Sequence, residues 1–245
     1  INLKKTNLSF FADKNDILIK NIFGFLEEIN ISDGDIKLNL ENGIKLNSNF
    51  NSKINLSEKD TKKYIKFFKK YDAVKGLKTL KANLNNNFSI EFDDTYKVKD
   101  YNYSINGKLE KSKFELSNLI KNNFVSEEIK NIYFSDLKMK TVFKPKNVKI
   151  SGDGKYSFDN SNFLNINLEN NLNNDILNLK LDFNYKKNIE LSIINYKKPE
   201  SSVANIFLAL EKKKDDININ ELNFKEKNNS IKIQGLNFNN KKLLS

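Results

Sequence analysis

The stretch that decides the fold is DIKLNLENGIKLNSNFNSKINLS, residues 35–57. Its even positions carry the apolar side chains Ile36, Leu38, Leu40, Ile44, Leu46, Phe50, Ile54 and Leu56. Its odd positions hold only Asp, Lys, Asn, Glu, Ser and one Gly. Alternation with a period of two is typical of a β-strand with one apolar face. Asn42-Gly43, in the middle, predicts a tight hairpin turn because both residues tolerate positive φ.

The same alternation recurs along the chain and predicts roughly fifteen short strands joined by Asn/Asp turns. Turns are predicted at Asp93-Asp94, Asn106-Gly107, Gly152-Asp153-Gly154, Lys186-Lys187-Asn188 and Asn228-Asn229. After the fourth of these turns, residues 189–193 are expected to pair with 177–185. Helical spacing of aromatic residues predicts a helix over 57–71, and a short helical turn is expected at 126–130. Residues 200–213 fit either pattern, and a strand from about Asn205 is favoured.

These patterns predict an all-β, mainly antiparallel fold. We expect an elongated, curved sheet with one apolar face, a taco-like β-groove with one or two short helices. Because no Gly-, Pro- or Ser-rich linker interrupts the pattern, residues 1–245 are expected to form a single continuous β-groove segment. The pattern runs through both ends, from Ile1 to the apolar pair Leu243-Leu244, so we expect the segment to belong to a longer chain.

The composition limits the chemistry. The chain has no Cys and no His, which excludes disulfides, Cys/His zinc sites and His-based acid–base catalysis within these residues. The net charge is +11. Two explanations stay open for it: the codon bias of an AT-rich genome, or a basic surface for anionic partners. Lysines are spread along the chain without Arg–aromatic interleaving, so a nucleic-acid partner is not expected.

No catalytic, cofactor or metal motif stands out. Acidic pairs such as Asp93-Asp94 and Glu127-Glu128 are typical of solvated turns. Asp33-Gly34-Asp35 and Gly152-Asp153-Gly154 are similar to calcium loops but lack the remaining ligands, so turns between strands are expected there. There is no phosphate-binding loop. We therefore expect a protein that is not an enzyme and needs no cofactor.

The apolar face itself is the remaining candidate site. It can be an ordinary sandwich core, or it can bind something apolar, since few helices are predicted to cover it. The candidate lipid-groove residues are Ile36, Leu38, Leu40, Ile44, Leu46, Phe50, Phe88, Ile90, Phe92, Leu177, Leu179, Leu181, Phe183, Ile189, Leu191 and Ile193.

Two phrases carry a resemblance to a known family: NISDGDIKLNLENGIKLNSNF (30–50) and DININELNFKEKNNSIKIQGLNFNN (216–240). In its short strands with one apolar face and its Asn/Asp turns, the chain resembles the AsmA-like superfamily (AsmA, TamB, YhdP), and its YhdP-like branch most. The resemblance implies a periplasmic segment of an inner-membrane-anchored protein in a Gram-negative envelope. Its partners would be phospholipid and the inner and outer membranes, between which it would carry acyl chains in outer-membrane biogenesis.

A second hypothesis comes from a different class of protein. The segment could be a structural or adhesive β segment of a surface protein, such as an autotransporter passenger or a fibre. That class favours regular repeats and Gly-rich turns. The irregular period and the 8 Gly argue against it.

Overall fold

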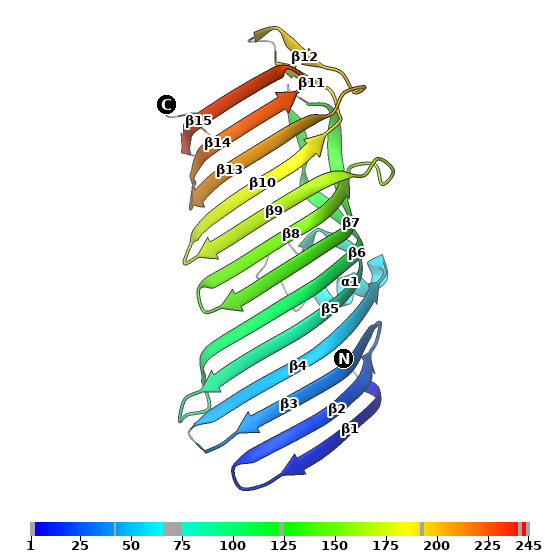
Figure 1. The fold of residues 1–245 in the computed structure, drawn as a ribbon, viewed down its shortest axis with the longest axis vertical. Helices are drawn as coiled ribbons and strands as arrows, with labels where there is room; N and C mark the ends of the chain where they lie inside the picture. Colours follow the sequence, from blue (N-terminus) through cyan, green and yellow to red (C-terminus); the bar gives the residue numbers. More distant parts are fainter. Residues whose placement is uncertain are drawn as a thin grey trace.

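The computed structural model describes residues 3–41, 43–65, 75–122, 125–191, 194–239 and 242–243. They form an elongated, curved antiparallel sheet that is not closed into a barrel, which confirms the predicted fold class. Figure 1 shows the strands stacked along the long axis, with β1 at one end and β15 near the other. One α-helix, α1 (Glu58–Ile65), is present among the described residues.

The strands alternate in direction along the chain. In the first half they are β1 (Leu3–Ala12), β2 (Asp16–Leu26), β3 (Ile29–Asn39), β4 (Ile44–Leu56), β5 (Leu77–Phe92), β6 (Val98–Asn122), β7 (Val125–Lys144) and β8 (Asn147–Ser157). In the second half they are β9 (Leu164–Asn173), β10 (Ile176–Tyr185), β11 (Ile189–Leu191), β12 (Tyr196–Lys198), β13 (Ala204–Lys213), β14 (Asp216–Glu226), β15 (Asn229–Asn239) and β16 (Lys242–Leu243).

Each strand pairs with the next along the chain, with one exception. β10 pairs with β13, so β11 and β12 lie off the main path and form an insertion between them. Among the described residues, this insertion pairs with a strand of the main sheet at Ile189, which lies opposite Val125 of β7. The expectation that 189–193 pairs with β10 is therefore wrong for Ile189 and Leu191, because β13 offers β10 a ten-residue partner.

The register places apolar residues of successive strands opposite one another, so that they form rows across one face. One row contains Phe88, Tyr103, Phe143, Val148, Leu172 and Leu177. Another contains Leu168, Leu181, Leu208, Leu222 and Ile233. Residues directly opposite in an antiparallel pair lie on the same face. The predicted alternation thus gives one apolar face, which we call the apolar face below.

β-Bulges mark the places where sequence patterns suggested turns. Asp33 and Asp136 have positive φ and lie at register shifts inside β3 and β7. A glycine lies beside each bulge. Gly34 follows Asp33 in β3 and faces Ile22 of β2. Gly154, in β8, faces Leu137 of β7 so closely that a Cβ on Gly154 would lie 2.5 Å from the Cα of Leu137. Bulges bend a strand and increase its twist, and glycine permits the close approach.

The predicted turns were therefore partly wrong. Residues 33–35, 106–107 and 152–154 lie within strands, because their glycines serve close backbone contacts instead of chain reversal. The turn at 93–94 and a strand start near Asn205 are confirmed, and β10 ends before 186–188 as predicted, although no hairpin with 189–191 follows. The turn predicted at Asn228-Asn229 lies one residue earlier, at 227–228, because Asn229 begins β15. Residues 126–130 belong to β7, not to a helical turn, because this long strand pairs with β6. Helix α1 begins as predicted; residues 66–71 lie outside the described residues, as does Asn42 of the first predicted turn.

The bulge at β7 gives a stability prediction. Gly154→Ala is expected to lower the free energy of unfolding by about 2–3 kcal/mol, because the new methyl group would overlap the backbone of Leu137. Gly152→Ala, on the same strand, is the matched control, since its methyl group would meet the mobile end of the Leu137 side chain at 3.3 Å. Urea unfolding of both variants measures the difference. Equal losses would contradict the role of Gly154.

Candidate functional site

The predicted lipid-groove residues lie in two groups on the apolar face. On β3, β4 and β5 the register places Leu38 opposite Leu46 and Leu46 opposite Ile90, and it places Ile44 opposite Phe92. On β10, Leu177, Leu179, Leu181 and Phe183 share one face and lie opposite β13. The row through Tyr103 and Phe143 joins the two groups; the rings of these two residues stack at 5.8 Å.

Four predicted residues lie elsewhere. Leu40 follows the end of β3 and is 38% exposed. Ile189 and Leu191 belong to the β11–β12 insertion. Ile193 lies outside the described residues.

Exposure of the apolar face changes from one long edge of the sheet to the other. The edge that carries helix α1, the 158–163 loop and the β11–β12 insertion is covered, and Tyr156 there is only 3% exposed. Toward the tight turns on the opposite edge, Leu172 is 39% exposed. Other exposed apolar residues near this second edge include Phe10, Phe11, Leu40, Tyr96, Val98 and Tyr101. The face is therefore half covered and half open.

The total surface area agrees with an open face. The chain exposes 16265 Å². A compact globular protein of 28.5 kDa is expected to expose about 11,000 Å². In a closed sandwich the apolar side chains of β9, β10 and β15 would be buried, but they are only partly buried here. The described residues therefore do not form the second layer that a sandwich core requires.

A few polar side chains lie on the apolar face, and some of them are hydrogen-bonded to one another. Asn86 is 3% exposed; its amide donates to the Ser52 hydroxyl at 2.9 Å, and its oxygen accepts from the Tyr103 hydroxyl at 2.8 Å. Burial raises the pKa of Tyr103, which keeps this donor protonated at neutral pH. The buried Thr141 hydroxyl has no hydrogen-bond partner among the described residues. This cluster is covered by neighbouring side chains and is part of the packing.

The β11–β12 insertion covers one end of the apolar face. The ring of Tyr196, in β12, lies 5.7 Å from that of Phe224, in β14. The buried carboxylate of Glu226 accepts hydrogen bonds from Tyr196 at 3.0 Å and Asn229 at 3.3 Å. Burial favours the neutral acid, but hydrogen bonds from Ser202, Asn229 and Tyr196 outweigh it and lower the pKa of Glu226. The insertion is thus fixed by polar as well as aromatic contacts.

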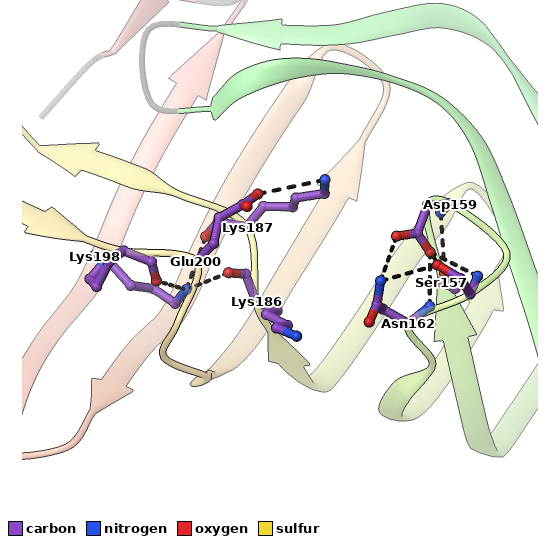
Figure 2. Close-up of polar contacts among 9 residues, drawn as sticks. Ser157, Asp159, Asn162, Lys186, Lys187, Lys198 and Glu200 are labelled. Atoms are coloured by element: carbon purple, nitrogen blue, oxygen red, sulfur yellow. Dashed lines mark hydrogen bonds and ion pairs between the residues drawn. The ribbon is translucent and has the colours of Figure 1, made fainter.

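Lys198 is fully buried in this region, with 0% exposure. Its ammonium donates to the carbonyl oxygens of Lys186 (2.8 Å), Lys187 (3.0 Å) and Pro199 (3.0 Å), as Figure 2 shows in part. It also lies 5.8 Å from the centre of the Tyr185 ring. Burial lowers the pKa of Lys198. Three carbonyls match the three donors of an ammonium, so Lys198 fixes the backbone of residues 186–187.

A pocket of about 120 Å³ lies between this backbone and the 158–163 loop. We call it the rim pocket. Its apolar side consists of Tyr156, Phe158 and Leu164, and its charged side of Lys186, Lys187 and Glu200. Lys187 forms an ion pair with Glu200 at 3.7 Å. A space of this volume is several times what a water molecule needs.

The loop side of the rim pocket is built around the Asp159 carboxylate. It accepts hydrogen bonds from the Ser157 hydroxyl (2.7 Å), the Ser161 amide (2.9 Å) and both the backbone and the side-chain amide of Asn162 (Figure 2). Led by the backbone amide of Asn162, these bonds hold the pKa of Asp159 far below its usual range. The carboxylate is fully used by its own turn, so its role is to hold the loop.

Further hollows lie on the polar face of the sheet. One of about 620 Å³ is lined by side chains such as Lys140, Glu169 and Lys180. It is a shallow depression between strands with charged walls. Among the described residues there is no group of three or more Asp or Glu that could hold a metal ion. None of the described helices is long and apolar enough to cross a membrane.

Sequence reasoning did not find the rim pocket. Lys198 is one of many lysines, and nothing in its local pattern distinguishes a buried ammonium from a solvated one. Its caging depends on the β11–β12 insertion, whose pairing was predicted wrongly. The aromatic spacing of Tyr156 and Phe158 was visible but indicated only a strand.

The Lys198 cage gives a second stability prediction. Lys198→Met is expected to lower the free energy of unfolding by about 2–3 kcal/mol, because three carbonyl groups lose their buried donor. The neighbouring Lys197, whose ammonium pairs with Glu190 at 3.8 Å on the surface, is the control. Lys197→Met is expected to change the free energy of unfolding by less than about 0.5 kcal/mol. Similar values for both variants would show that the cage contributes nothing.

The Asp159 turn gives a prediction about pH. Because the pKa of Asp159 is lowered on folding, its stabilisation is complete above the unfolded value of 3.8 and is lost as the pH falls through the folded pKa. Asp159→Asn is expected to cost about 1 kcal/mol at pH 7 and progressively less below pH 3.8. Urea unfolding from pH 7 to below pH 3.8 measures the stability lost in Asp159→Asn, with Asp215→Asn as the control. A cost that does not vary with pH would contradict the assignment.

Comparison of the chain with protein-family models, with curated proteins and with solved structures gave no match, so its resemblance to the AsmA-like superfamily stays a prediction.

Proposed function

We propose that the chain is a non-enzymatic lipid-transfer segment that binds the acyl chains of phospholipids along its apolar face. The observation that carries the proposal is the half-open apolar face, which continues from strand to strand through the sheet. Large exposed apolar surfaces mark sites for a partner, a ligand or a lipid. The half nearer the tight turns is the part that acyl chains would occupy.

The energetics favour such a ligand. Exposing an acyl chain of about fifteen methylenes to water costs roughly 12 kcal/mol of free energy, at about 0.8 kcal/mol for each methylene. A carrier must offset most of this cost over a continuous apolar track. Specific polar contacts to the chain are unnecessary, which is consistent with a face built almost entirely of aliphatic and aromatic side chains.

The dimensions also fit. The fourteen strands on the main path, spaced about 4.8 Å apart, give an apolar track of roughly 60 Å. An acyl chain in one leaflet reaches about 15 Å, half the hydrocarbon thickness of a bilayer. Several chains could therefore lie along the track in sequence. Together with the AsmA-like resemblance, this supports a place in the periplasm, in an inner-membrane-anchored protein that carries phospholipid between the inner and outer membranes.

Native mass spectrometry with lipid extraction tests this function. The protein purified from a Gram-negative host is expected to carry bound phospholipid. Leu46→Asp and Leu179→Asp, on the two halves of the face, are expected to remove most of it, because a carboxylate on the track cannot be covered by an acyl chain without a desolvation cost.

The matched controls lie beside these residues on the polar face. Asn47→Asp and Asn178→Asp add the same charge to the same strands at exposed positions, and they are expected to keep the lipid. Circular dichroism confirms folding of all four variants. A lipid-free, folded monomer would sink the proposal and favour the structural or adhesive β segment.

A further inference from the structure

The rim pocket has one cationic side chain that the protein does not use. Asp159 is saturated by its own turn, Lys198 is caged by carbonyls, and Glu200 pairs with Lys187. Lys186 contributes its carbonyl oxygen to the cage, but no carboxylate of the described residues lies within 4.0 Å of its ammonium. Figure 2 shows Lys186 between the Lys198 cage and the Ser157–Asn162 turn.

The backbone that carries Lys186 is held in place. Lys198 binds the carbonyl oxygens of both Lys186 and Lys187, and the facing loop is tied by the bonds to Asp159. Rigid walls on both sides reduce the ordering that a ligand must cause when it binds. Because the buried Lys198 holds these carbonyl oxygens in place, the backbone on this side of the pocket is fixed before any ligand binds.

The surroundings of Lys186 are amphipathic. Tyr156, Phe158 and Leu164 form the other side of the pocket. The ring of Tyr156 packs edge-on against that of Phe183 on the apolar face, with ring centres 5.9 Å apart. The pocket therefore joins an available cation to the covered edge of the apolar face. A ligand that fits both has an anionic group next to an apolar body.

We infer that the rim pocket binds the phosphate of a phospholipid headgroup through Lys186, with the glycerol and the adjoining methylenes against the half-buried Phe158 and Leu164. This inference rests on the proposed function and adds to it the polar end of the lipid. A charge-assisted hydrogen bond from an ammonium to a phosphate oxygen is stronger than a neutral one. Phosphatidic acid differs from diacylglycerol by this phosphate alone.

Calorimetric titration of the full chain with three probes tests the inference: dihexanoyl phosphatidic acid, dihexanoylglycerol and inorganic phosphate. The wild type is expected to bind the phosphatidic acid more tightly than the diacylglycerol. Lys186→Gln keeps the carbonyl that Lys198 requires, and it is expected to weaken phosphatidic acid binding roughly fivefold to tenfold while leaving diacylglycerol binding unchanged. Lys180→Gln, the same change on the polar face of β10, is expected to alter neither.

The possible outcomes are distinct. If Lys186→Gln leaves phosphatidic acid binding unchanged while both lipids still bind, the headgroup inference is overturned and the apolar face keeps its proposed function. If only inorganic phosphate binding depends on Lys186, the pocket is a site for free anions and the inference is also overturned. If the wild type binds neither lipid, the proposed function itself fails. Circular dichroism of each variant confirms that the fold is intact.

Discussion

The structure depends on one constraint: a sheet that is apolar on one face must cover that face or leave it in contact with water. In this chain apolar residues alternate with polar ones, mostly Lys and Asn, along most strands, so the apolar face continues across the hydrogen-bonded strands. The described residues cover one long edge of it, with α1, the 158–163 loop and the β11–β12 insertion. The difference in exposure between Tyr156 and Leu172 measures this asymmetry directly.

Curvature follows from local defects in the pairing. The register shifts at Asp33 and Asp136 each add a residue to one strand, which increases the local twist, and Gly34 and Gly154 let the neighbouring backbone approach. The polar face tolerates this bending because its side chains are long and solvated. Pairs such as Lys108 with Asp136 and Lys78 with Glu115 cross between neighbouring strands there. They fix orientation more than they add stability, since exposed pairs contribute little.

The period of the sequence predicted the fold class, the helix start and most strand positions, because side-chain alternation is a local property that pairing does not change. It did not distinguish a glycine in a turn from a glycine beside a bulge. Gly107 and Gly154 are both flanked by turn-forming residues, and only the strand across from each decides its role. The same limit applies to Lys198: its burial results from contacts with carbonyls of residues about ten positions away, brought together by an insertion with short strands.

The covered edge of the apolar face brings together a caged lysine, a saturated aspartate and a cluster of aromatic rings. A protein that needed only to shield this edge could do so with aliphatic side chains, which bury no ammonium and need no carbonyl cage. The polar elements here instead hold two backbone segments apart, and Lys186 lies between them. The open edge carries no comparable arrangement among the described residues. The sheet is therefore asymmetric in chemistry as well as in exposure: one edge holds charged side chains around a pocket, and the face beside it is apolar.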